Sequence, residues 1–173
     1  MSVYLVLTVI GNDRPGLVGE LSAVISQHQG NWLESSMSRL AGKFAGIVKV
    51  SVPEAHARPL QQALEDLSDL KVTLESSAIG SESRGGRRLH LSLVGHDRIG
   101  IVREVSQVLA RHAINVEALE THTSSAPMSA ETLFHAEAEL LADASLDTRT
   151  LTLELENISN DLMVDISLDE KIS

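Results

Sequence analysis

Apolar and polar residues alternate with two periods along the first half of the chain. A period of two predicts a strand, and apolar residues recurring every three to four positions predict a helix. Residues 3–10 are apolar on both alternating faces, which indicates a central strand buried on both sides. Further strands are predicted at 31–40, 43–52 and 71–76, and a second helix at 53–67.

The first helix is predicted from its boundary residues and its apolar face. Asp13 is a favoured helix cap, Pro15 suits a first helical turn, and Gly30 is a plausible stop. Between them, apolar residues recur at helical spacing. They are Leu17, Leu21, Val24 and Ile25, followed by His28.

The second half repeats the first at an offset of 84 residues. Without gaps, 12 of the 27 positions from 5 to 31 are identical to those from 89 to 115. Chance does not produce such a match, so the chain is an internal duplication. The predicted strands are 89–94, 115–123, 132–141 and 163–168, and the predicted helices are 99–112 and 147–160.

Each half therefore has the order βαββαβ, which predicts an α+β, ferredoxin-like domain: a four-stranded antiparallel sheet with both helices on one face. The expected boundaries are 1–79 and 89–173, joined by a Gly-, Ser- and Arg-rich linker at 80–88. Arg84, Arg87 and Arg88 are interpreted as solvated linker residues. Because the inner strands are expected to be apolar on both sides, something must cover the helix-free faces. We expect intimate packing of the repeats, a homodimer, or both.

Composition narrows the class of function. The formal net charge of −10 disfavours direct nucleic-acid binding, and the lack of cysteine excludes disulfides and thiolate chemistry. No apolar run is long enough to span a membrane and no secretory leader is visible, so a cytoplasmic protein is expected. No catalytic set, cofactor fingerprint or metal-helix histidine pair is found. We therefore expect no enzyme, no cofactor and no metal.

The most similar segments of the two halves are 11–16 and 95–100, each joining a first strand to a first helix. Exposed N–H groups at a helix start suit a carboxylate, and Gly16 and Gly100 would let a ligand approach the backbone. Asp13 and Asp97 can accept hydrogen bonds from an ammonium group, or they can simply cap their helices. Donor N–H groups beside an aspartate that accepts hydrogen bonds match the two charged groups of a zwitterionic amino acid.

Two further positions in each half carry polar side chains of interest. Asn31 and Asn115 follow the first helices, where they either form a turn or reach a ligand held between two domains. Asn12 is replaced by His96 in the second copy, and Pro15 by Ile99, so the two sites need not bind the same ligand. His96 is the histidine expected to contact a ligand.

The motif Gly-x-Asp-Arg-x-Gly after a first strand, the apolar helix and the following Asn resemble the ACT family of amino-acid-sensing domains. Two such domains in tandem resemble the glycine cleavage system transcriptional repressor group. This resemblance implies an amino-acid ligand, glycine or serine first, and regulation through contact with a transcription factor. It implies ligand contacts at the following residues: Asn12, Asp13, Gly16, Leu17 and Asn31 in copy one, and His96, Asp97, Gly100, Ile101 and Asn115 in copy two.

Two alternatives stay open. One is a constitutive interaction module that has lost its ligand sites. The other is a regulatory subunit of an enzyme of amino-acid or one-carbon metabolism.

Overall fold

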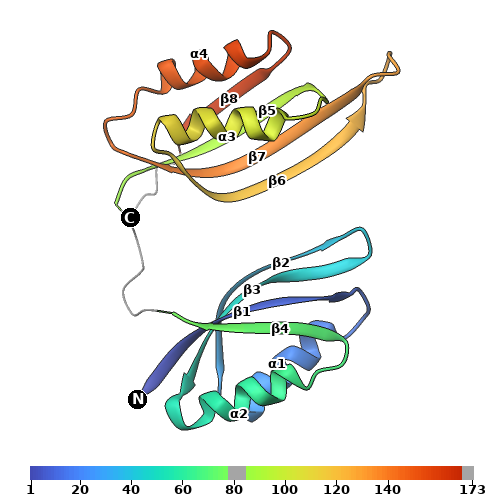
Figure 1. Ribbon diagram of the computed structural model, residues 1–173, viewed down its shortest axis with the longest axis vertical. Helices are drawn as coiled ribbons and strands as arrows, with labels where there is room; N and C mark the ends of the chain where they lie inside the picture. The colour runs from blue at the N-terminus through green and yellow to red at the C-terminus, as the bar shows by residue number, and fades with distance from the viewer. Residues whose placement is uncertain (78–84, 169–173) are drawn as a thin grey trace. The chain divides into compact units, whose positions relative to one another are not determined.

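The computed structural model describes residues 1–77 and 85–168 (Figure 1). The chain divides into two compact units, residues 1–83 and 84–173. Of the expected linker, residues 80–84, including Arg84, lie outside the described residues. Its last two residues, Arg87 and Arg88, belong instead to the first strand of the second unit, where they pair with Ala142 and Leu141.

The first unit has the order βαββαβ with sheet order β2-β3-β1-β4, and all its strand pairs are antiparallel. The two helices lie together on one face of the sheet (Figure 1). Its elements are β1 (Ser2–Asn12), α1 (Leu17–Gln27), β2 (Asn31–Leu40), β3 (Lys43–Pro53), α2 (Glu54–Glu65) and β4 (Leu70–Ser76).

The second unit repeats this topology with sheet order β6-β7-β5-β8. The predicted α+β fold is thus confirmed for both halves. The elements are β5 (Arg87–His96), α3 (Ile101–Arg111), β6 (Asn115–Ser125), β7 (Thr132–Ala142), α4 (Thr148–Ile158) and β8 (Met163–Leu168). Even a β-bulge recurs, between Trp32 and Glu34 in β2 and between Val116 and Ala118 in β6.

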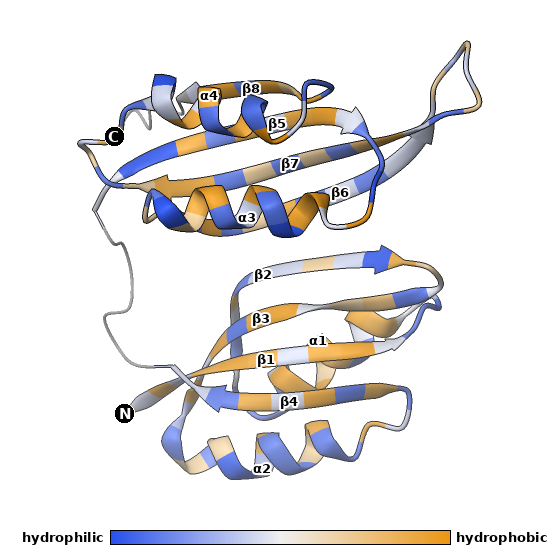
Figure 2. Ribbon diagram, turned by 45° about the horizontal axis from the view of Figure 1, so that its top comes forward, coloured by the Kyte–Doolittle hydropathy of each residue, from blue (hydrophilic) through white to orange (hydrophobic). Residues whose placement is uncertain are grey.

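A separate aliphatic core fills each unit between sheet and helices. In the first, Leu7 of β1 and Leu21 of α1 are fully buried, as is Leu64 of α2. In the second, Leu89 of β5 and Leu151 of α4 are fully buried. Figure 2 shows that the central strand β1 is largely hydrophobic while the edge strand β2 is mostly neutral or hydrophilic. Burial of these side chains is the main stabilising term for a chain so poor in aromatic residues.

The helix-free faces differ between the two sheets. On β1, this face carries Val6, which is half-buried, and Ile10, which is 45% exposed. On β5, the corresponding positions hold the polar residues Arg88, His90 and Ser92, followed by the half-buried Val94. The expectation that both inner strands are apolar on both sides is therefore wrong for β5, because its outward positions hold charged and hydroxyl groups.

The first helix of each unit begins and ends at other residues than the sequence suggested. The left-handed Gly16 directly precedes α1, so Pro15 lies before the helix. At its other end, Gln29 takes the left-handed conformation expected of a stop residue, with φ of 58°. Gly30 is not that stop; a Cβ atom on it would lie 2.7 Å from the Cγ2 of Ile25, so close packing requires glycine there.

Candidate functional site

The β1–α1 loop (Asp13–Gly16) and the β5–α3 loop (Asp97–Gly100) share one backbone geometry. Gly16 and Gly100 precede their helices with φ of 91° and 87°, a left-handed conformation that favours glycine. Neither helix receives a side-chain cap. The interpretation of Asp13 and Asp97 as helix caps is therefore wrong, because each helix begins four residues after its aspartate.

Without a capping side chain, the N–H groups of each first helical turn stay available to an anion. At the end of that turn, the N–H groups of Glu20 and Glu104 are already used within the helix. They donate to Gly16 O and Gly100 O, at 2.9 and 3.0 Å. The preceding N–H groups carry the positive end of the helix dipole. This is the arrangement that suits a carboxylate.

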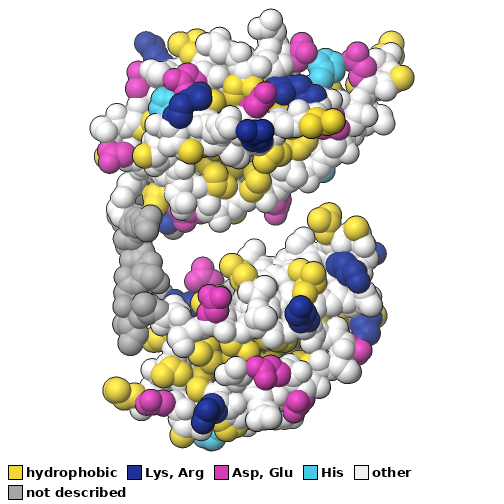
Figure 3. All heavy atoms as spheres, in the orientation of Figure 1, with side chains coloured by type: hydrophobic (Ala, Val, Ile, Leu, Met, Phe, Trp, Pro, Cys, Tyr) yellow, Lys and Arg dark blue, Asp and Glu magenta, His cyan; other side chains and the backbone are white. Residues whose placement is uncertain are grey.

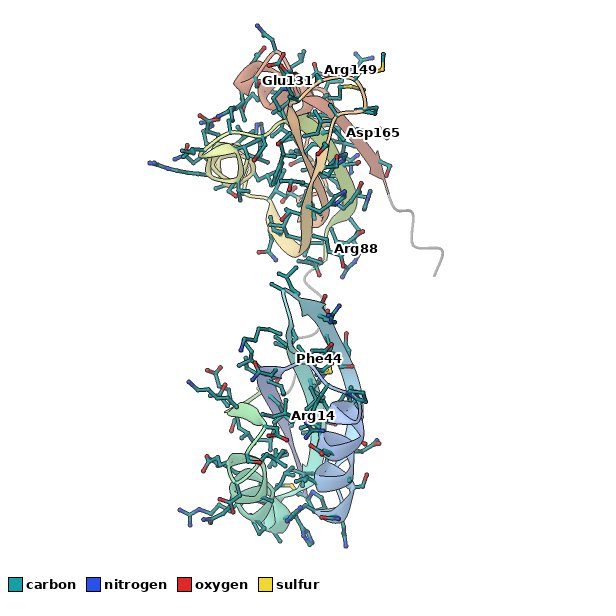
Figure 4. The ribbon with its side chains drawn as sticks, turned by 90° about the vertical axis from the view of Figure 1, so that its right-hand side faces the viewer. Arg14, Phe44, Arg88, Glu131, Arg149 and Asp165 are labelled. Carbon is teal, nitrogen blue, oxygen red and sulfur yellow. The ribbon has the colours of Figure 1, made fainter. Side chains whose placement is uncertain are left out.

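An arginine in each loop binds the glutamate of the first helical turn. Arg14 Nη2 lies 2.7 Å from a carboxylate oxygen of Glu20, and Arg98 pairs with Glu104. Arg14 also donates through Nε to Asp69, at 3.1 Å, and lies beside α1 in Figure 4. Hydrogen bonds to Glu20 and Asp69 raise the pKa of the Arg14 guanidinium. These pairs fix the loop against its helix.

The other polar groups of the first loop are engaged by neighbouring strands. The carboxylate of Asp13 lies 2.6 Å from Arg39 Nε of β2. The side-chain oxygen of Asn12 accepts from Lys43 Nζ of β3. Both candidate ligand contacts therefore already have protein partners.

The second loop is less occupied. His96 Nδ1 lies 3.3 Å from a carboxylate oxygen of Glu131. Asp97 is exposed, and within residues 1–77 and 85–168 no side-chain hydrogen bond or ion pair involves its carboxylate. Its backbone N–H donates to Thr132 O at 2.9 Å, which fixes its position. The second copy therefore presents a positioned, uncompensated carboxylate.

The remaining predicted residues divide into two groups. Leu17 and Ile101 are 3% and 4% exposed, so their side chains belong to the core and only their backbone N–H groups can meet a ligand. Asn31 pairs with Ser51, whereas Asn12 pairs with Lys43, eight residues away along β3. At a strand rise of about 3.4 Å per residue, roughly 27 Å separates the two ends.

Asn115 is placed in the same way, because it pairs with Leu141 while His96 pairs with Leu133. Within one domain, the structure therefore does not bring either asparagine to the loop. Only a site shared with another domain would unite them.

Sequence reasoning gave no role to Gly11 and Gly95, which end the two first strands. A Cβ atom on Gly11 would lie 2.3 Å from Asp69 O, and one on Gly95 2.7 Å from Leu162 Cδ2. Because neither glycine has a Cβ atom, the segment before the last strand of each domain can pack closely against the first strand. Their recurrence at the 84-residue offset was the available signal.

Two concave regions accompany the loops. An open hollow lies at the end of β1, where Asn12 and Lys43 line it together with Asp69 and Lys71. In the second domain an apolar groove runs between α3 and β6, where hydrophobic side chains gather in Figure 3. Its exposed rim includes Val102, Val116 and Leu119, which are 43%, 39% and 50% exposed.

The repeated histidines at the helix ends have structural partners. His28 Nδ1 lies 2.8 Å from Val24 O, one turn earlier, and His112 Nε2 lies 3.0 Å from Glu154 of α4. The hydrogen bond from His112 lowers the pKa of Glu154. Across the described part of the chain, no three His, Asp or Glu side chains are grouped to hold a metal ion.

In the same described ranges, no helix is long and apolar enough to cross a membrane.

The fold and the two glycine-ended loops define a pair of similar ferredoxin-like domains. Two family profiles, both described as ACT domain, match residues 3–76 and residues 90–144. The chain belongs to the ACT domain family and consists of two ACT domains in tandem.

Two curated relatives match part of the chain. A UPF0237 protein of Methanopyrus kandleri is 38% identical over 68 residues, which are 36% of this chain and 76% of that protein. A UPF0237 protein of Methanococcus maripaludis is 31% identical over 77 residues, 44% of this chain and 74% of that protein. Each relative is thus similar in length to one half of the duplication.

Two solved structures match nearly the whole chain. An unknown protein from Galdieria sulphuraria has a TM-score of 0.86 and 29% identity over 98% of this chain and 100% of that chain. A proposed glycine cleavage system transcriptional repressor has a TM-score of 0.73 and 18% identity over 99% of both chains. At 18% identity, the second likeness concerns the fold alone.

Proposed function

We propose that this protein is an amino-acid-responsive regulator that acts by contact with another protein and is not an enzyme. The observation that carries the proposal is the uncapped start of α3 beside the unpaired carboxylate of Asp97. Backbone N–H groups can donate hydrogen bonds to the carboxylate of a free amino acid, while an anionic side chain can accept hydrogen bonds from its ammonium group. The ACT family membership of both domains supports this reading.

The second domain is proposed as the principal ligand site. In the first domain Arg39 and Lys43 already bind Asp13 and Asn12. At the offset of 84 residues Arg39 is replaced by Thr123, and across the strand pair Leu133 stands opposite His96 as Lys43 stands opposite Asn12. An ammonium group would therefore compete with a protein cation at Asp13 but not at Asp97.

The ligand contacts follow from this geometry. The N–H groups at Gly100 and Ile101 would bind the carboxylate, and Asp97 would bind the ammonium group. His96 would contact the side chain or the second carboxylate oxygen. Asn31 and Asn115, together with Asn12, Asp13, Gly16 and Leu17, would contribute only where a second domain adjoins the loop. Glycine and serine are the first ligands to test because a fold neighbour is a proposed repressor of the glycine cleavage system.

The partner is proposed to be a transcription factor or an enzyme. The apolar groove between α3 and β6 offers exposed side chains of the kind that protein interfaces bury. A net charge of −10 favours leaving any nucleic acid to that partner. Ligand binding at the start of α3 would shift the conformations that the groove adopts, because Val102 and Val105 of the same helix line it.

A thermal-shift screen of the twenty amino acids with the full chain tests the ligand. At saturating concentration, glycine or serine should raise the melting temperature, since a ligand that binds only the folded state stabilises it. Asp97→Asn should fold normally and lose this shift. Glu75→Gln, which removes one charge from β4 of the first domain, is the matched control and should keep it. If no amino acid gives a shift, the ligand-responsive function is wrong and a constitutive interaction module is the better description.

A further inference from the structure

The helix-free face of the second sheet carries a connected polar cluster. His90 and Ser92 point outward from the central strand β5, and Glu139 and Glu137 stand directly opposite them on β7. Neither residue pair belongs to the ligand loop, which lies at the end of β5. We refer to these four residues as the His90 cluster.

The contacts of His90 favour its protonated form. Its Nδ1 lies 2.7 Å from Glu139 Oε1, and its Nε2 contacts Glu137 Oε2. An ionised carboxylate only accepts hydrogen bonds, so both ring nitrogens must donate. Both do so only in the imidazolium form. Ser92 Oγ donates to the other oxygen of Glu137, at 2.7 Å, which holds that carboxylate in place.

Other titratable groups face the cluster from β6 and β8, and one of them, His122, also acts on the carboxylate of Glu137. On β6, Glu120 stands opposite Glu137, and His122 stacks on His135 at 4.5 Å between ring centroids. On β8, Asp165 stands opposite Ser92, and Ser167 stands opposite His90 itself. In Figure 4, Arg88 and Asp165 lie on the side of the sheet away from α3.

Arg88 is the next cation along β5, but it is 3.0 Å from Glu117 Oε1 and is thus already paired. Within the described residues, the carboxylates of Glu137 and Glu139 contact the ring of His90, and Glu120 and Asp165 stand opposite Glu137 and Ser92 on the neighbouring strands.

The first domain shows that the fold itself does not require this cluster. The position of His90 corresponds to Val6, which stands opposite Lys49, and that of Ser92 corresponds to Thr8, which stands opposite Ile47. The same places of the same sheet thus hold valine, lysine, threonine and isoleucine in the first copy. The acidic and imidazole groups are specific to the second copy.

We propose that the helix-free face of the second ACT domain is a proton-sensitive surface, in which imidazolium His90 holds the carboxylates of β7 together and its deprotonation loosens the pairing of β6 with β7. Like charges directly opposite on neighbouring strands are destabilising. Once the ring is neutral, His90 no longer offsets the repulsion between Glu137 and the facing Glu120. Because β6 is an edge strand, it is held on one side only.

The directions of the pKa shifts agree with this geometry. The hydrogen bond that His90 donates to Glu139 raises the pKa of His90, and the hydrogen bond to Glu137 adds to this effect. The hydrogen bond from Ser92 lowers the pKa of Glu137, with His90 acting in the same direction. A raised histidine pKa means that the stabilisation is complete below the ordinary value of 6.5 and is lost as pH rises through the folded-state value.

NMR titration of the histidine rings in the full chain tests the cluster. His90 should titrate above 6.5, and Glu139→Gln should lower its midpoint more than Glu137→Gln does. Glu75→Gln, on β4 of the first domain, is the matched control and should leave the midpoint unchanged. A His90 midpoint at or below 6.5, or one that neither glutamine variant moves, overturns the proposal.

Amide hydrogen exchange tests the structural consequence. Protection factors, which correct for the intrinsic effect of pH, should fall along β6 as pH rises through the His90 midpoint. In His90→Gln they should be low at every pH and show no such step. β2 of the first domain is the internal control and should not respond. If β6 keeps its protection above the midpoint, His90 is a surface histidine without a switching role.

Discussion

Asp13 Oδ2 lies 2.6 Å from Arg39 Nε in the first domain, and the second domain has no such pair because Thr123 takes the place of Arg39. The difference separates two loops whose backbones are otherwise alike. The carboxylate of Asp13 is paired with an arginine of its own domain, whereas that of Asp97 has no side-chain ion pair among the described residues. Under the proposed function, the two copies would divide structural and sensing tasks, and this substitution is one of the differences that separate them.

Arg39→Thr should hardly change stability. The arginine side chain is 69% exposed and that of Asp13 is 31% exposed, and ion pairs so open to water contribute about 0–1 kcal/mol. Urea unfolding should therefore show a loss below about 1 kcal/mol. A loss of several kcal/mol would mean that the pair holds the loop itself, and the proposed division of tasks between the copies would lose its support.

Glycine replacements in and before the loops should differ in cost. Gly100→Ala meets no atom within 4 Å, so only the left-handed backbone opposes it, at about 1 kcal/mol. Gly11→Ala places a Cβ 2.3 Å from the backbone oxygen of Asp69, which cannot turn aside as a side chain can. Equilibrium unfolding should show the larger loss for Gly11→Ala, and the reverse order would contradict this account of the two positions.

The two cores should be equally sensitive at equivalent places. Leu7 and Leu91 are 84 residues apart and are 0% and 2% exposed. Truncating either to alanine should cost its own domain about 2–5 kcal/mol, through lost burial and a cavity. Calorimetry or urea unfolding checks this. Leu40→Ala, at a side chain 78% exposed, is the control and should cost far less.

Ala113→Gly should stabilise the second domain. Ala113 follows α3 with φ of 54°, a left-handed conformation that disfavours residues with a Cβ atom. Glycine removes this strain, and a gain of up to about 1 kcal/mol is expected. Thermal unfolding measures it. Ala110→Gly, within α3, should instead lower the melting temperature, because glycine weakens a helix interior.

The side chain of Asp147 should make the stability of α4 depend on pH in the acidic range. Its side chain accepts hydrogen bonds from the N–H of Arg149 and the hydroxyl of Thr150, at 3.0 and 3.1 Å, and the first of these lowers its pKa most. A lowered carboxylate pKa means that the stabilisation is present above the unfolded-state value and is lost as pH falls through the folded-state value.

Comparison of two variants separates the cap from its charge. Asp147→Ala should lower the melting temperature at neutral pH, whereas Asp147→Asn should retain most of the cap and reduce the loss on acidification. Equal melting temperatures for wild type and Asp147→Ala at neutral pH would show that the cap is unimportant.

The sequence predicted the topology because the copies agree with each other. Alternation in β1 and helical spacing in α1 recur in β5 and α3, so each copy supports the interpretation of the other. Helix starts were predicted less well. Asp13 satisfies every local rule for a cap, but Gly16 ends the loop, and the hydrogen bond from Asp13 N to Gly42 O belongs to a neighbouring hairpin. Such contacts join residues that are far apart in the sequence, so a pattern of a few consecutive residues does not predict them.

The site was predicted in part for the same reason. Segment similarity located the two loops, which the structure confirms as the starts of α1 and α3. It did not indicate that Asp13 is paired with a residue of β2, nor that Asn31 and Asn12 lie at opposite ends of one sheet. The pairing of His90 with Glu137 and Glu139, 47 and 49 residues away, required the strand register.

The bulges shared by β2 and β6 bear on how the protein behaves when concentrated. A long, flat sheet rim is a template on which other chains can aggregate, and natural sheets avoid this by twisting the rim and charging it. Here each bulge interrupts the regular ladder near the start of its strand, and Glu34 or Glu117 lies beside it. Because both copies keep the same irregularity, each edge strand retains a feature that disfavours edge-to-edge association.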